Sequence, residues 1–155
     1  MIRKAVRADL EDILKVYRAA KAYMRATGNL TQWEDGYPDC VLEGDIEKGQ
    51  LYVLCDDAGE VRAAFAFILG EDPTYAYIEK GSWRSDEPYG TIHRIGSDGK
   101  MKGVFSLCLD FCSAVIPHLR ADTHRDNKTM QHVLEKHGFV RRGIIYTDDG
   151  TPRIA

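Results

Sequence analysis

The chain has 155 residues, of which 44% are hydrophobic and 29% charged, and its formal net charge is -3. These values are typical of one globular domain with a real core, and we expect residues 1–155 to form a single domain. The slightly acidic balance gives no reason to expect a nucleic-acid partner or binding to a membrane surface.

The first half of the chain predicts a short strand, two helices and a hairpin. Asp9 is suited to cap a helix whose apolar residues recur at helical spacing, and Gly28 is suited to end it. Pro38 fits the first position of a second helix. The second segment of the hairpin is apolar on both faces, which predicts a central strand. The expected elements are a strand at 2–6, helices at 9–28 and 38–49, and strands at 51–55 and 61–68.

The second half predicts one long irregular stretch and then alternating strands and helices. Two prolines, three tyrosines and Trp83 indicate an irregular excursion over residues 70–90, and loops of this length are usually functional. The helix expected at 103–115 is apolar around most of its circumference, which indicates burial against a sheet. The other expected elements are strands at 75–78, 91–95, 119–123, 139–146 and 151–155, a helix at 127–138 and a turn at 148–150.

The cysteines indicate whether the chain binds a metal, and the first residues indicate the cellular compartment in which it works. The four cysteines form no Cys-x-x-Cys pair, and Cys108 and Cys112 lie one helical turn apart in an apolar run. We therefore expect core thiols and no metal site. The chain starts directly with a polar segment and never approaches the roughly 18 consecutive apolar residues of a membrane helix. We accordingly expect no signal peptide, no membrane span and a cytoplasmic protein.

The basic stretch from Lys100 to Phe105 lies between the strand at 91–95 and the buried helix. Backbone N–H groups at the start of a helix have no partner inside it, and together they carry about half a positive charge. Two lysines and a glycine beside such groups favour a phosphate site, with a solvated basic turn as the alternative. Residues 1–90 hold 11 Lys/Arg and 17 Asp/Glu, whereas residues 91–142 hold 9 and 5, so the positive excess accompanies this loop.

The order of elements, this basic loop and the pattern Asn-x7-Glu-Lys-x-Gly-Phe from Asn127 to Phe139 resemble the GCN5-related N-acetyltransferase superfamily. The resemblance covers nearly the whole chain and is greatest to small bacterial members. The family's cofactor loop, Arg/Gln-x-x-Gly-x-Gly/Ala, falls on residues 100–105, where Gly103 matches and Phe105 replaces a small residue. The resemblance implies an α+β (α/β three-layer) acyl-CoA N-acyltransferase fold. In that fold about four helices accompany a mixed, mostly antiparallel splayed sheet of six to seven strands.

The resemblance also implies the cosubstrate acetyl-CoA. Its pantetheine arm would pair with the backbone of the strand at 91–95, and its diphosphate would accept hydrogen bonds from the N–H groups of the basic loop. For Asn127 the residue type alone offers a helix N-cap as the alternative role. The residues expected to bind acetyl-CoA are Ile95, Lys100, Met101, Lys102, Gly103, Val104, Phe105 and Asn127.

Acetyl transfer from a thioester to an amine needs a neutral amine, donors for the oxyanion and a proton for the thiolate. His93 is our first candidate for the base and His124 the second, because imidazoles titrate near neutrality; a histidine hydrogen-bonded at a strand surface is the alternative. Many family members place a proton-donating tyrosine seven residues after the asparagine, where this chain has Leu134. Either another group supplies the proton, or water does, or catalysis is slow; Tyr146 on the following strand is a candidate donor.

We expect the loop at 29–37 to form the part of the site that binds the acceptor amine. Trp33 and Tyr37 are predicted either to line a substrate pocket or to pin the loop to the core, and Glu34 or Asp35 would attract a cationic amine. The leading hypothesis is an acetyl-CoA-dependent N-acetyltransferase that acts on a primary amine of a small molecule, or secondarily of a protein. It would act by direct attack in a ternary complex, as a possible homodimer by family analogy.

Two other functions stay open at this point. Leu134 and Phe105 favour a noncatalytic acyl-CoA-binding or regulatory module on the same fold. A general nucleotide-phosphate binder is the third hypothesis, and the lack of a Walker loop counts against it. The sequence does not specify the acceptor amine.

Overall fold

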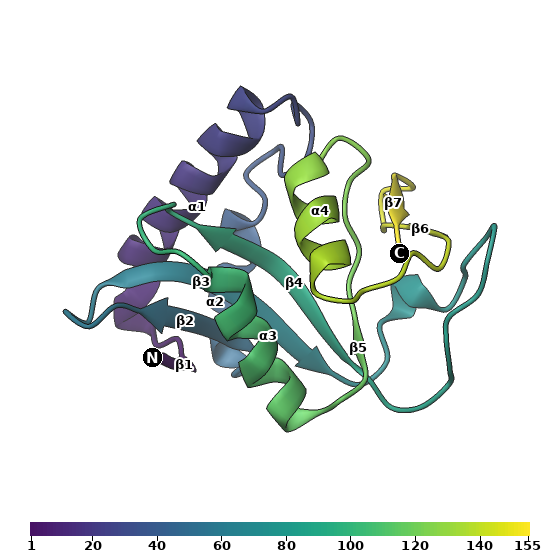
Figure 1. Ribbon diagram of the computed structural model, residues 1–155. Helices are drawn as coiled ribbons and strands as arrows, with labels where there is room; N and C mark the ends of the chain where they lie inside the picture. Colours follow the sequence, from purple (N-terminus) through teal and green to yellow (C-terminus); the bar gives the residue numbers. More distant parts are fainter.

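The computed structural model describes residues 1–155 as a five-stranded sheet between helices, with a two-stranded ribbon beside it (Figure 1). The strands are β1 (Ile2–Lys4), β2 (Leu51–Cys55), β3 (Val61–Leu69), β4 (Gly90–Ser97), β5 (Leu119–Arg120), β6 (Ile144–Tyr146) and β7 (Pro152–Ile154). The helices are α1 (Leu10–Ala26), α2 (Leu42–Glu47), α3 (Val104–Val115) and α4 (Lys128–Lys136), with 3-10 turns at Arg7–Asp9, Asp39–Val41 and Pro73–Tyr75. The expected mixed α+β class with four helices is confirmed.

The large sheet has the order β1-β2-β3-β4-β5, in which only the β4–β5 pair is parallel. The expected β2–β3 hairpin and the central position of β3 are confirmed. The remaining two strands form a separate β6–β7 ribbon instead of extending the sheet. The parallel pair joins only Gly90 to Leu119 and Thr91 to Arg120, whereas β4 continues to Ser97. From Thr91 onward the two strands diverge, as a splayed sheet requires.

Each face of the sheet has its own apolar cluster. Along β2, Leu51 and Val53 pack with α1 and α2, whereas Leu54 packs with α3, because successive side chains point to opposite faces. Cys108 and Cys112 are completely buried and unbonded, and burial raises the pKa of both thiols to about 12. The expectation that they are core thiols is confirmed.

The excursion at 70–90 folds onto the β6–β7 ribbon around a small third cluster that contains Tyr75 and Tyr89. Single backbone bridges join Glu79 to Ile144 and link the ribbon to the segment after β5. The predicted strand at 75–78 is wrong. Asp72 accepts a hydrogen bond from the Thr74 N–H, and Pro73 follows it, so the chain makes a 3-10 turn here.

Two of the predicted helix starts also differ from the structure. The carboxylate of Asp9 does not cap α1; it pairs with Arg3 at 2.8 Å and accepts the Val6 N–H. The hydrogen bond from Arg3 is the main reason why the pKa of Asp9 is lowered. Pro38 precedes a 3-10 turn, and α2 begins only at Leu42.

The predicted strand at 139–146 is confirmed only for its last three residues. Phe139 still donates its N–H to the end of α4, and the side chain of Arg141 bonds Glu135 and Gln131 on that helix. These bonds hold residues 139–141 along α4, and the Arg142 N–H then bonds the carbonyl of Ala155 after β7. None of the helices combines the length and the apolar character that crossing a bilayer requires.

Candidate active site

A cavity of about 670 Å³ lies where β4 diverges from β5. Its walls come from β4, the loops around residues 31–37, 71–74 and 147–153, the segment 121–124 and α4. The predicted site residues that it brings together are Trp33, Tyr37, His93, Ile95, Phe105 and Asn127. These residues come from segments far apart in the sequence, so the cavity is the natural candidate for the active site.

His93 occupies the centre of a polar group in this cavity. Its Nε2 lies 2.8 Å from Oδ2 of Asp72, and its Nδ1 lies 3.9 Å from Oδ2 of Asp122. The Tyr75 hydroxyl donates to the same Asp122 oxygen at 2.7 Å. The side chains of His93, Asp72 and Asp122 are 20%, 16% and 14% exposed, so they are shielded from bulk water but still open to the cavity.

Asp72 is held firmly on its other oxygen. Its Oδ1 accepts the Thr74 N–H at 2.9 Å and the Thr74 hydroxyl at 2.6 Å. Burial favours the neutral acid, but the hydrogen bonds from His93 and Thr74 outweigh it and lower the pKa of Asp72 to about 2. The group is therefore a carboxylate at neutral pH.

A β-bulge follows His93 on β4. Ala66 pairs with His93 and Ala64 pairs with Gly96, so Arg94 and a second β4 residue, Ile95, oppose a single residue of β3. Arg94 has a φ of 53°, a left-handed conformation that costs a side-chain-bearing residue energy.

The network around Arg94 explains how this conformation persists. The guanidinium of Arg94 bonds both carboxylate oxygens of Asp45 at 3.0 Å and the Tyr37 hydroxyl at 3.1 Å. The Tyr17 hydroxyl donates to the Arg94 carbonyl at 2.7 Å. The bulge is thereby fastened to α1, α2 and the loop at 29–37.

The start of α3 presents a run of free backbone donors. Gly103, with a φ of 70°, turns the chain into the helix, and the N–H groups of residues 101–106 meet no acceptor within the chain. The N–H of Lys100 is already bonded to Asp98, whose charge is offset by Arg62 at 3.1 Å. The loop therefore offers an anion a cradle of N–H groups.

Asn127 performs the N-cap role that its residue type allows. Its Oδ1 accepts the Met130 N–H at 3.0 Å, and its Nδ2 donates to Oε1 of Gln32 at 3.0 Å. Asn29 donates to the same Gln32 oxygen at 2.8 Å. The side chain thus ties α4 to the loop at 29–37 at the wall of the cavity, and its contact with acetyl-CoA stays a prediction.

The structure places the other two proton-transfer candidates differently from His93. His124 accepts the Asp126 N–H at Nδ1 and its Nε2 contacts the Thr31 hydroxyl at 3.1 Å, so both ring nitrogens are engaged. Burial lowers the pKa of His124. The Tyr146 hydroxyl donates to Glu79, a bond that raises the pKa of Tyr146, and Tyr146 does not line the cavity.

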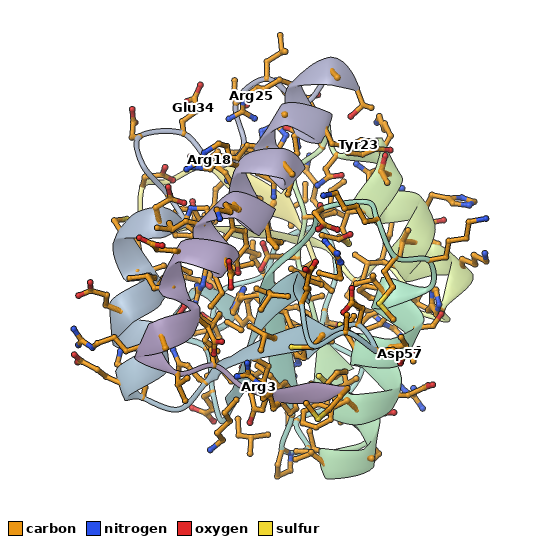
Figure 2. All side chains as sticks on the ribbon, turned by 90° about the vertical axis from the view of Figure 1, so that its left-hand side faces the viewer. Arg3, Arg18, Tyr23, Arg25, Glu34 and Asp57 are labelled. Carbon is orange, nitrogen blue, oxygen red and sulfur yellow. The ribbon has the colours of Figure 1, made fainter.

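The loop at 29–37 is fixed to α1. Arg25 donates to the carbonyl oxygens of Asn29 at 3.0 Å and Trp33 at 3.3 Å, and the Trp33 ring packs edge-on against Tyr17. Figure 2 shows Arg25 and Glu34 at one end of α1 and Arg3 at the other. Both alternatives for Trp33 are therefore seen together: it pins the loop and it lines the cavity.

Several residues of the site were not found from the sequence, namely Asp45, Asp72, Tyr75, Arg94 and Asp122. The Asp-Pro-Thr turn at 72–74 carries a local capping signal, but nothing in the sequence aims its carboxylate at His93. The cavity is also strongly acidic, which favours cationic ligands. Its carboxylates are Glu34, Asp35, Glu71, Asp72, Asp122, Asp148 and Asp149, against Arg94 and Arg153. No group of three or more His, Cys, Asp or Glu is arranged to hold a metal ion.

Comparison with solved structures gives close matches over the full chain. A GNAT-family acetyltransferase from Streptococcus agalactiae is 32% identical, with a TM-score of 0.84 over 99% of this chain and 91% of that chain. A GNAT-family acetyltransferase from Listeria monocytogenes is 18% identical, with a TM-score of 0.71 over 99% and 92%. An aminoglycoside antibiotic 6'-N-acetyltransferase from Acinetobacter haemolyticus shares the fold at 16% identity, with a TM-score of 0.64 over 92% of each chain. No protein-family model and no curated protein matches the chain.

Proposed function

The chain belongs to the GNAT family of acetyltransferases, and from this premise we propose that it transfers the acetyl group of acetyl-CoA to a primary amine of a small molecule. One observation carries the proposal. His93, its neighbours on β4 and Phe105 of the first turn of α3 line a single cavity, and the loop of free N–H groups leads directly into Phe105. This arrangement is consistent with acetyl-CoA bound with its diphosphate on the loop at 100–105, its pantetheine arm along β4 and its thioester near His93.

The residues present suit coenzyme A at the loop. The N–H groups of residues 101–106 would hold the diphosphate, with Lys100 and Lys102 adding positive charge. The Phe105 ring packs against His137, with centroids 5.1 Å apart, and against Phe139. This bulky replacement is thus accommodated by packing at the end of α4. Ile95 on β4 and Asn127 at the start of α4 both line the cavity and would contact the pantetheine arm.

His93 is the base in this proposal. It keeps one ring nitrogen without a close hydrogen-bond partner, whereas both nitrogens of His124 are engaged. The bulge beside His93 sets Arg94 and Ile95 opposite one residue of β3, and in this proposal a backbone N–H of the bulge donates to the oxyanion. In this proposal the amine attacks the thioester directly, within a ternary complex.

The acceptor is a cationic amine. Carboxylates from three separate loops face the cavity, and a cleft lined by one sign of charge concentrates ligands of the other sign. Trp33 and Tyr37 supply an apolar wall on the same side. A diamine or polyamine suits this lining better than an amine that carries a carboxylate.

A noncatalytic acyl-CoA-binding module on the same fold is the second candidate, because Leu134 lines the cavity without offering a proton to the leaving thiolate. The two candidates are separated by measuring thiol release from acetyl-CoA with a panel of diamines, polyamines, aminoglycosides and lysine peptides. We expect thiol release with dicationic amines and none without an amine.

Calorimetry with acetyl-CoA, CoA and ATP completes this test. Binding of acetyl-CoA without turnover of any amine would favour the noncatalytic module. Binding of ATP in preference to both CoA compounds would overturn both candidates.

A further inference from the structure

We propose that Asp72 and Asp122 divide two tasks around His93: Asp72 fixes the imidazole so that Nδ1 is the basic atom, and Asp122 holds the ammonium form of the acceptor beside it. This inference rests on the proposed function and names the residue that positions the base and the residue that binds the amine. Neither aspartate was singled out by the sequence.

The contact with Asp72 determines the tautomer of His93. Asp72 is ionised at neutral pH, so its carboxylate only accepts hydrogen bonds. Its Oδ2 lies 2.8 Å from Nε2 of His93, and Nε2 must therefore carry the proton of the neutral ring. The two bonds from Thr74 to Oδ1 keep the carboxylate from turning away. The lone pair of the neutral ring is consequently on Nδ1.

The basic atom Nδ1 of His93 faces Asp122. The nearest partner is Oδ2 of Asp122 at 3.9 Å, which is too far for a direct hydrogen bond. A carboxylate has about four acceptor positions, and within the chain Asp122 receives only the Tyr75 hydroxyl. An ammonium group has three N–H donors, so it can donate to Asp122 and to Nδ1 together. Both residues line the cavity from which an amine would arrive.

The charged and titratable groups around His93 agree with this division. Asp72 approaches from the segment after β3, Asp122 from the segment after β5, and Tyr75 packs at 6.1 Å between ring centroids. Arg94, the next residue on β4, is matched by Asp45 and Tyr37. The imidazolium formed during the reaction therefore has carboxylates on both sides and no unmatched cation next to it.

Proton transfer from the acceptor comes before bond formation. The ammonium gives one proton to Nδ1, and the neutral amine nitrogen forms a bond to the carbonyl carbon of the thioester. The carbon–sulfur bond then breaks, and the second proton of the attacking nitrogen passes to the leaving thiolate. His93 returns its proton to solvent, so the products are the acetamide, CoA as its thiol and one proton.

The tautomer is tested by ¹⁵N NMR of the histidines, which needs no turnover. We expect a protonated Nε2 and an unprotonated Nδ1 at His93 above the pH at which the ring becomes neutral. In Asp72→Asn we expect this preference to weaken, and Asp72→Glu serves as a second variant if the amide misfolds. A wild-type His93 with its proton on Nδ1 would overturn the proposal even if the protein proved to be an active acetyltransferase.

The role of Asp122 is tested by binding and by kinetics. Addition of spermidine, the probe amine, is expected to shift the Nδ1 resonance of His93 in the wild type and not in Asp122→Asn. With an accepted amine, Asp122→Asn should raise KM for the amine roughly 10- to 100-fold and change kcat less. An unchanged KM or an unchanged spermidine shift in this variant would remove Asp122 as the ammonium partner.

The role of Asp72 has a separate kinetic signature. Asp72→Asn should lower kcat roughly 10- to 100-fold with little change in KM. Asp57→Asn is the matched control, since Asp57 is exposed at the tip of the β2–β3 hairpin, and it should leave the tautomer of His93 and both kinetic constants unchanged. A kcat that is unchanged in Asp72→Asn, or one that falls while the tautomer of His93 stays fixed, would overturn the positioning role.

Discussion

The candidate site has two ends that are built by different means: the loop before α3, of which Phe105 lines the cavity, and the polar group around His93. At the start of α3 the binding groups are backbone N–H groups in consecutive residues, and a single glycine sets their direction. Around His93 the groups are side chains from segments that lie on different strands and loops. A backbone site tolerates many residue types, whereas a side-chain site depends on each of its members. The two ends should therefore respond differently to substitution.

The largest effect is expected at the side-chain end. His93→Ala removes the base, which should lower kcat about 10²- to 10⁴-fold while the Kd for acetyl-CoA is unchanged. Steady-state kinetics and calorimetry measure the two quantities. His132→Ala, an exposed histidine on α4, is the control. Unchanged turnover on the accepted amine would remove His93 as the base.

A smaller effect is expected at the backbone end. Replacing Lys100 and Lys102 together by Glu puts two negative charges beside the N–H groups and should raise the Kd for acetyl-CoA roughly 10- to 100-fold. Replacing both by Met should raise it much less, because the N–H groups remain. Lys15→Glu with Lys48→Glu is the matched charge control on the α1 and α2 side. Calorimetry that finds binding untouched by the double reversal at the loop would show that the diphosphate does not bind here.

The third effect is on stability at acid pH. Asp72 has a pKa of about 2 in the folded protein against an ordinary value of 3.8, so its carboxylate stabilises the fold above pH 3.8 and loses this effect as the pH falls to about 2. The contribution at neutral pH is about 2 kcal/mol. Urea unfolding of wild type and Asp72→Asn should therefore differ most near neutrality and converge toward pH 3 and below. A difference that is constant down to the lowest pH would contradict the shifted pKa.

The smallest effect separates the two roles of Asn127, which caps α4 and lines the cavity. Asn127→Ala should lower the free energy of unfolding by about 1 kcal/mol through loss of the N-cap, whereas Asn127→Asp keeps the cap. If Asn127 also contacts coenzyme A, Asn127→Asp should weaken acetyl-CoA binding without lowering stability. Thermal unfolding and calorimetry on the same samples distinguish the outcomes, and unchanged binding in Asn127→Asp would leave Asn127 with the capping role alone.

The same contrast explains what could be predicted from the sequence. The hairpin, the central strand and the loop before α3 were predicted because each depends on neighbouring residues, such as an apolar run or a glycine that follows two lysines. The pairing of His93 with Asp72 and Asp122 depends on three segments meeting in space, and one sequence gives no sign of that meeting. The residue type of His93 and its position on a strand indicate a candidate base, but they do not indicate that Asp72 and Asp122 are its partners.

The errors in the fold have a similar origin. Residues 75–78 and 139–143 have strand-like composition, but the local Asp72–Thr74 bond and the bonds from Arg141 to α4 prevail over that preference. Asp9 has the residue type of a helix cap, but Arg3, six residues earlier, takes its carboxylate. In each case a specific side-chain partner overrides a statistical tendency of the chain.

The two-residue pairing of β4 with β5 decides where the unpaired edge of β4 lies. An unpaired strand edge presents a row of backbone groups to which the strands of other molecules can add. In this chain residues 92–95 of that edge line the candidate-site cavity, which also has walls from α4 and from three loops. The early separation of the two strands thus turns part of a sheet edge into the wall of a concave site.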